Sequence, residues 1–405
     1  MGAQTAVARG FQYGLIIFTL TAVLGLASAT QIFGALDRNT LLTHLHSGTL
    51  GWITMGVLST AAWMFGASSP SLGRNLALSA GATALYVLGF WSGSLPARAL
   101  TGSIELVVIL AWWWWVLQRS LAQGLGVIGV GKLSVLLGLT TLIIGSTIGV
   151  IVQLQFATAT ASAQTGALIG THASAQVGGY LVLVAAGIVE WLLRGDQQRS
   201  LAGTLQPSFL FVAGLLFAMG TLVGITPFLL LANLLQTIAI GMIVVRIGPA
   251  AARVAWGAVD GKRHAAVVVG YLVLAVGLIV ALTQIVIANQ GDFSKVPLGM
   301  IHGLDHAMFV GVSTNALFAT IIAFTASRPR VWPWADQVIF WGLNLGALSF
   351  IGVLLFVGSG YGAKPFTSPV AFTASIMGLS ALLGIATFWQ RLQPAPEAAR
   401  VPAPA

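Results

Sequence analysis

Residues 43–66 read THLHSGTLGWITMGVLSTAAWMFG, a largely apolar stretch that contains no acidic residue, lysine or arginine and opens with two histidines. A helix of about 20 such residues is long enough to cross a membrane. An ionisable side chain inside a membrane segment is costly, so it marks a functional site by default and calls for a partner. His302 and His306 open a second apolar segment of the same kind. The sequence therefore predicts a membrane protein organised around histidines.

Composition supports a protein built almost entirely of membrane segments. Of the 405 residues, 57% are hydrophobic and 7% are charged, whereas about 25% charged is usual in soluble domains. The formal charge of +9 comes from basic residues that stand singly between apolar runs, which is typical of topology signals and predicts no nucleic-acid partner. The chain has no cysteine, which excludes disulfides, thiolate metal sites and covalently attached haem, so metal ligands would be histidine or oxygen.

The apolar runs predict an all-α, polytopic membrane protein with twelve transmembrane helices. Residues 1–392 would form one domain, and the Pro- and Ala-rich residues 393–405 a disordered cytoplasmic tail. The first run is long enough to span, so we expect it to be retained rather than cleaved as a signal peptide. The twelve segments start near residues 10, 43, 73, 97, 132, 166, 203, 226, 264, 297, 335 and 367.

The basic residues predict the orientation. With twelve spans, fourteen of the eighteen Lys and Arg residues fall in the loops and tails on the side of both termini, and four fall on the other side. Basic residues near span ends are retained in the cytoplasm. We therefore expect a bacterial-type plasma membrane protein with both termini in the cytoplasm.

Histidine spacing suggests an internal repeat. His46 and His172 are 126 residues apart, His172 and His306 are 134 apart, and a third of the chain is 135 residues. This pattern favours three pseudo-repeated four-helix arcs, each with a histidine near the outer end of its second helix. The sixth histidine, His264, follows Lys262 and Arg263, and we expect it to be an ordinary residue at the membrane interface.

The histidines near the outer ends of these helices predict a cofactor. At 3.6 residues per turn, His44 and His46 point about 200° apart and so address two sides of their helix, whereas His302 and His306 point about 40° apart. Neutral imidazole is a common ligand of haem iron and of other metals. We expect a haem between the segments that carry these four histidines; the alternative is that they line a water-filled vestibule or join helices by hydrogen bonds.

Two carboxyl groups lie within predicted spans. Asp305, next to His306, is expected either to orient a ligating imidazole or carry protons, or to face the outer surface. Glu105 is expected to be buried, as a proton relay or as one side of a hydrogen bond between helices. Both are candidates for a proton path or for support of a ligand.

The nine residues HLHSGTLGW at 44–52 closely resemble the H-x-H-S-G-x-L-G-W run of C-type haem-copper oxidase subunit I. The superfamily also includes the nitric oxide reductase catalytic subunits. The expected twelve spans and threefold layout are similar to that superfamily over the whole chain, while only this run is specific in sequence. The resemblance implies a low-spin haem b held by His46 and His306, His302 as ligand of a possible second haem, and His172 as a ligand of a further metal.

The resemblance is incomplete where the second metal would bind. The family's seventh helix supplies two histidines, but the corresponding segment here, residues 201–222, has none, and Gln176 stands where one version of the family has tyrosine. A metal needs three or four ligands, so copper or non-haem iron is not expected, and neither is the reduction of dioxygen to water.

These observations leave three hypotheses for function. The first is a haem-binding protein of electron transfer or small-gas chemistry, an oxidoreductase of the haem-copper oxidase or nitric oxide reductase type, embedded in the lipid bilayer and served by an electron-donor subunit or cytochrome. The second is a proton-coupled secondary transporter with a histidine-lined path. The third is a structural relative that binds nothing. The sequence does not define the oligomeric state.

Overall fold

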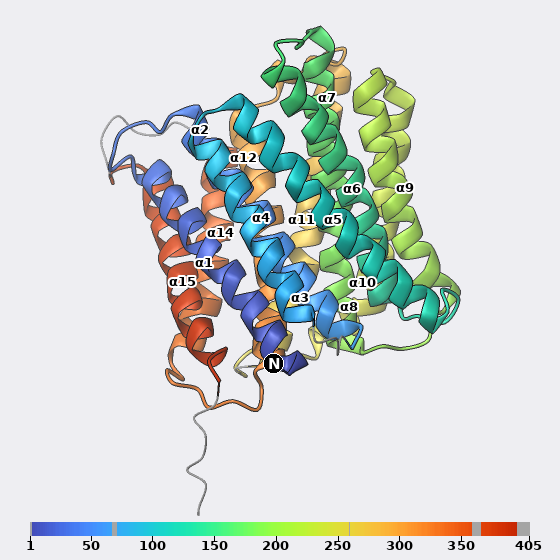
Figure 1. Cartoon of the computed structure of the whole chain (residues 1–405), viewed down its shortest axis with the longest axis vertical. Helices are drawn as coiled ribbons and strands as arrows, with labels where there is room; N and C mark the ends of the chain where they lie inside the picture. The colour runs from blue at the N-terminus through green and yellow to red at the C-terminus, as the bar shows by residue number, and fades with distance from the viewer. Residues whose placement is uncertain (1, 67–70, 259, 359–365, 395–405) are drawn as a thin grey trace, which may run out of the picture.

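The computed structural model describes residues 2–66, 71–258, 260–358 and 366–394. Its elements in this part of the chain are helices packed side by side (Figure 1). From residue 395 on, the predicted disordered tail lies outside the described residues. The α-helices are α1 Ala3–Thr30, α2 Arg38–His46, α3 Met55–Met64, α4 Leu72–Trp91, α5 Leu95–Gln123, α6 Val130–Ala157, α7 Ala163–Ser174, α8 Val182–Arg194, α9 Leu201–Val223, α10 Thr226–Ala252, α11 Gly261–Ala288, α12 Leu298–His306, α13 Asn315–Phe324, α14 Ala335–Phe356 and α15 Pro369–Arg391.

The described chain is an all-helical, multi-pass membrane protein. Ten of its helices are long and apolar enough to cross a membrane. The two helical segments outside these ten are α4 and Arg38–Met64, the segment that carries His44 and His46. The start of α1 and the end of α15 lie at the same end of the bundle, at the bottom of Figure 1, which we call the terminal end. The opposite end, where α2, α7 and α12 begin, is called the histidine end.

Three of the long helices are interrupted at matching places by a π-helical segment. The interruptions are Ser47–Thr54 between α2 and α3, Ala175–Leu181 between α7 and α8, and Ala307–Thr314 between α12 and α13. They begin directly after His46, Ser174 and His306. A π segment widens a helix locally and is frequent at functional sites. Three helices far apart in the sequence thus share one uncommon local structure.

A glycine at the fifth position of each π segment lets the preceding long helix approach closely. These glycines are Gly51, Gly179 and Gly311. A Cβ atom would lie 2.1 Å from Ile17 Cγ2 of α1 at Gly51, and 2.1 Å from Tyr271 Cδ1 of α11 at Gly311. At Gly179 the nearest atoms belong to α6, at 3.2 Å. The three interrupted helices therefore pack against their predecessors by the same device, close approach at a small residue.

Hydrogen bonds join the interrupted helices to one another. Trp52 Nε1 donates to Thr314 Oγ1 over 3.0 Å, and Tyr180 OH donates to Thr54 Oγ1 over 3.1 Å. All four side chains are buried. The bond from Trp52 links the second long helical segment to the tenth, and the bond from Tyr180 links the sixth to the second. These three segments consequently form the centre of the bundle.

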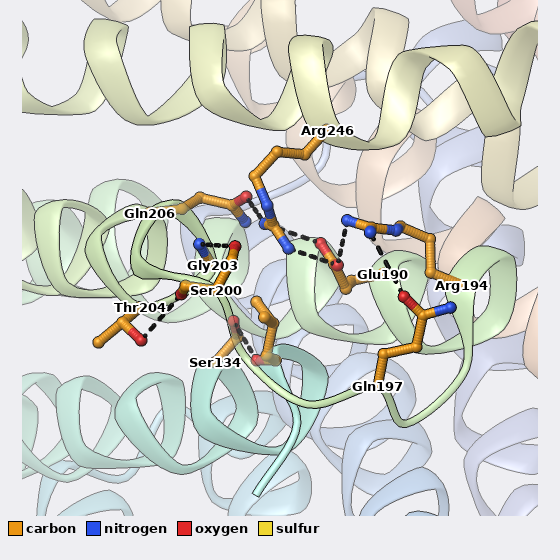
Figure 2. A network of polar contacts seen from close by, with 10 residues as sticks. Ser134, Glu190, Arg194, Gln197, Ser200, Gly203, Thr204, Gln206 and Arg246 are labelled. Carbon is orange, nitrogen blue, oxygen red and sulfur yellow. Dashed lines mark hydrogen bonds and ion pairs between the residues drawn. The ribbon is translucent and has the colours of Figure 1, made fainter. Parts of the chain in front are cut away.

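A second polar cluster fastens α8, α9 and α10 near the terminal end (Figure 2). Arg246 donates to both carboxylate oxygens of Glu190, over 2.7 and 3.1 Å, and also to Gln206. Arg194, one turn beyond Glu190, adds a bond of 3.2 Å to the same carboxylate. Because Glu190 and Arg246 are both largely shielded from solvent, each depends on the other for its charge.

Removing one partner of this cluster should destabilise the protein strongly. We expect Glu190→Gln to lower the free energy of unfolding by about 3 kcal/mol, because Arg246 would stay buried without a counter-charge. Arg194→Gln is the matched control and should cost less than ~1 kcal/mol, since that side chain is 31% exposed. Unfolding of the purified protein in detergent measures both. Equal losses of stability in the two variants would contradict the conclusion that the buried pair of Glu190 and Arg246 holds these helices together.

Candidate functional site

His44 and His46 leave their helix on opposite sides, as their spacing predicts. The Nδ1 atom of His44 lies 2.9 Å from the carbonyl oxygen of Thr21 in α1, and a Cβ at Gly25 of the same helix would lie 2.8 Å from His44 Cε1. His46 instead stacks on Phe90 of α4, with ring centroids 3.9 Å apart. The prediction that this helix addresses two sides is confirmed.

Four histidines share one hydrogen-bonding arrangement, in which Nδ1 faces a backbone carbonyl. A carbonyl can only accept, so Nδ1 carries the hydrogen and Nε2 keeps its lone pair. Bonding of one ring nitrogen in this way fixes the tautomer and orientation of an imidazole that ligates through the other. The bonds run from His44 to Thr21, from His46 to Leu42 over 2.8 Å, from His172 to Gly145 over 2.7 Å, and from His306 to His302 over 2.7 Å.

The histidines fall into two groups. His46 and His172 line one cavity of about 240 Å³. His44, His302 and His306 are not among the residues that line it, and the ring of His306 meets Phe350 of α14 edge-on, with centroids 4.6 Å apart. The structure thus places His46 and His172 on the wall of one cavity.

Both candidate carboxyl groups line the cavity that contains His46 and His172. Glu105 is buried, its Oε1 accepts a hydrogen bond of 3.0 Å from Thr83 of α4, and its Oε2 has no partner. The predicted bond between helices therefore exists, and one oxygen remains free for other contacts. Asp305 is half-buried. It does not orient His306, whose Nδ1 is bonded to the carbonyl of His302.

The expectation for His264 is wrong. Its side chain is 1% exposed and lies among protein side chains rather than at an interface. Its Nδ1 faces Asn315 Oδ1 at 2.7 Å, and its ring meets Phe340 edge-on. We predicted an interfacial position because the neighbouring Lys262 and Arg263 suggested a helix end in water. In the structure, α14 covers this face of α11.

The cavity also contains groups that the histidine pattern could not reveal. Tyr86 of α4 lines the cavity and meets the ring of His46 edge-on, and Phe90 of the same helix stacks on that ring. Gly149 of α6 leaves room for His172, because a Cβ there would lie 2.9 Å from Nδ1 of the imidazole. A single aromatic or glycine in an apolar helix carries no sequence signal of this role, since such residues are common in membrane helices.

The residues present are better suited to a ligand that already contains its own metal than to a bare metal ion. Among the described residues, no three His, Asp, Glu or Cys side chains converge closely enough to hold a metal ion. His172, the candidate ligand of a further metal, has His46 and Gln176 as neighbours in the cavity lining. A structural metal site takes four ligands, so these side chains alone do not form one.

A search against models of protein families finds no match to this chain, and no curated protein matches it.

The bond between Thr83 and Glu105 should contribute measurably to stability. Thr83→Val would leave both carboxyl oxygens of Glu105 without a partner in a buried site, so we expect a loss of about 1–3 kcal/mol in the free energy of unfolding. Ser103→Ala on α5 is the control, because its hydroxyl bonds only to the carbonyl of Ala99 in its own helix. Thermal unfolding of the two variants side by side provides the measurement. A Thr83→Val variant as stable as Ser103→Ala would show that Glu105 does not need this donor.

Proposed function

We propose that this chain is a haem-binding integral membrane protein related to haem-copper oxidase subunit I, which handles electrons or a small gas such as nitric oxide or oxygen. One observation carries the proposal: four membrane-embedded imidazoles each have Nδ1 bonded to a carbonyl and Nε2 left with a free lone pair. This is the state in which imidazole ligates iron. The HLHSGTLGW run at residues 44–52 supports the relationship.

The donor set fits b-type haem. His46 and His172, which line one cavity, together with His44, His302 and His306, are the residues that would hold one or two haems. No cysteine exists for covalent attachment. The cavity beside His46 is mostly apolar, although its 240 Å³ is below the ~300–1,000 Å³ of typical ligand pockets. A macrocycle there would therefore have to displace side chains at the open edge of the cavity.

When bound, haem would supply one-electron transfer or the binding of a diatomic gas at iron. The chain's own residues do the rest. Carbonyls of Leu42 and Gly145 orient His46 and His172, and Phe90 covers one face of the His46 ring. Glu105, with Oε2 free, can hold or release a proton at the cavity wall. A dinuclear metal centre is not part of the proposal, because α9 contains no histidine to complete one.

The proposal includes twelve transmembrane spans in three four-helix arcs, with both termini in the cytoplasm of a bacterial-type cell. The matching π segments and the glycines Gly51, Gly179 and Gly311 support the repeat. The distribution of basic residues supports the orientation. An electron-donor subunit or cytochrome would then deliver electrons at a histidine end that faces outward.

A second candidate function is proton-coupled transport. It is favoured by Glu105 and Asp305, which share a cavity with two imidazoles and have no ion pair among the described residues. Titratable groups inside a membrane protein are frequent in proton relays of transporters. Transport would require access to this cavity from both ends in turn, whereas haem binding requires only that the ligand be held.

The haem proposal predicts that protein purified from haem-replete cells absorbs in the Soret region. His46→Ala, His172→Ala, His44→Ala and His306→Ala should each weaken this absorbance, because these imidazoles would hold the iron. His264→Gln is the control, since that imidazole lies outside both groups. A preparation that is colourless even after added haem would refute the proposal. Equal losses in all five variants would mean that the histidines act only through folding.

The orientation predicts that a reporter active only outside the cytoplasm is inactive when fused after Ala405. The same reporter inserted in the loop before α7, after Ala161, should be active, because this loop lies at the histidine end. Enzyme activity in intact cells measures both. An active fusion after Ala405 would reverse the proposed topology.

A further inference from the structure

The cavity beside His46 reaches the histidine end of the bundle between the three interrupted helices. The matching positions are Leu45, Ala173 and Asp305, each two residues before the π segment of its helix begins. All three line the cavity. Leu45 and Ala173 are exposed, and Asp305 is half-buried. Matching positions on three helices can line one cavity only if they face a common axis. These residues therefore form a mouth on that axis.

One turn deeper, the same helices line the cavity again. Thr49, Val177 and Phe309 stand four residues after the mouth positions, and each of them also contacts the cavity. Residues four apart lie on one face of a helix. The cavity thus continues inward along the axis, and His46 and His172 line its side.

Buried hydrogen-bonded side chains close the inner end. Trp52 is bonded to Thr314 and Tyr180 to Thr54, and the four side chains are at most 2% exposed. They lie deeper along the same three helices than Thr49, Val177 and Phe309. Thr54 and Tyr180 themselves line the cavity, which we call the vestibule, so these bonded side chains bound its inner end.

The charge of the vestibule is one-sided. Among the described residues that line it, Asp305 and Glu105 are the charged residue types, and there is no lysine or arginine. Arg98 lies near His46, but its guanidinium sits over the ring of Phe90 and donates to Asn39 Oδ1 and to the Phe90 carbonyl. The imidazole of His46 also stacks on the ring of Phe90. The carboxyl at the mouth therefore faces an entering molecule without a cation beside it.

We propose that this vestibule is an access path that admits cations and uncharged small molecules and rejects anions, with Asp305 as the residue that sets the selectivity. A cleft of one charge sign within low-dielectric walls concentrates counter-ions and repels ions of like charge. The other polar groups of the lining are imidazole, hydroxyl and amide, and none of them offers a fixed positive charge to compensate. The proposal rests on the geometry of the cavity and does not require a bound haem.

The absence of cysteine allows a direct test with single cysteine reporters. Full-length Ala173→Cys in lipid nanodiscs, which expose both faces, is treated with a cationic, an anionic or an uncharged methanethiosulfonate, and the rate is followed by mass spectrometry. Ala161→Cys, exposed in the loop at the same end, corrects for the intrinsic rates of the reagents. We expect the corrected ratio of cationic to anionic rates to be about tenfold or more at Ala173→Cys.

Asp305→Asn should bring this corrected ratio close to one, and Asp305→Glu should preserve it. A ratio of one with Asp305 intact, or an unchanged ratio in Asp305→Asn, would overturn the selectivity. The depth of the path is tested with the uncharged reagent, which should modify Val177→Cys but not Ala185→Cys, a site buried in α8 beyond the closed end. An unreactive Val177→Cys would overturn the vestibule. Every readout is independent of the Soret absorbance that tests haem binding, so the two proposals can fail separately.

Discussion

Inside a membrane every polar group has to find its partner within the protein, and the centre of this bundle depends on how three π segments meet that requirement. A π segment disturbs the regular pairing of backbone carbonyls. Thr54 donates to the carbonyl of Thr49, and Thr314 donates to the carbonyl of Phe309, each five residues back in the chain. In the third segment the carbonyl of Gly178 accepts from Gln236 of α10. The interruptions are thus satisfied by side chains, and two of those threonines also accept the bonds from Tyr180 and Trp52.

The same requirement determines how the histidines can act. A buried imidazole has two nitrogens to satisfy, and a helix or its neighbour offers carbonyls but few free donors. Nδ1–H therefore bonds to a carbonyl, and Nε2 is left facing whatever space the packing provides. Glycine makes room for the imidazole rings at Gly25 beside His44 and at Gly149 beside His172. The outcome is a set of imidazoles whose orientation is fixed by ordinary helix packing, without any dedicated loop.

Local periodicity predicted part of this arrangement and long-range packing decided the rest. The all-helical class and the opposite directions of His44 and His46 followed from composition and from 3.6 residues per turn. The equivalence of His172 with His46 and His306 did not hold in detail, because Ser174, not His172, precedes the π segment in that helix. The positions of the π segments and of the close glycine contacts depend on packing between helices, which sequence spacing alone cannot locate. Similarly, His264 looked interfacial because its covering helix lies far away in the sequence.

The acidic residues at the two ends of the bundle differ in whether they have a basic partner, and this contrast bears on function. At the terminal end Glu190 is paired with Arg246 and Arg194, and Asp336 with Arg391. At the histidine end Glu105 and Asp305 have no basic partner among the described residues, although they lie within the bundle. A buried acidic residue that stabilises the fold needs a counter-charge, since an unpaired buried charge is costly. Glu105 meets part of this requirement through its bond from Thr83, while its Oε2 stays without a partner, so the carboxyl groups at the histidine end differ from the ion-paired ones at the terminal end.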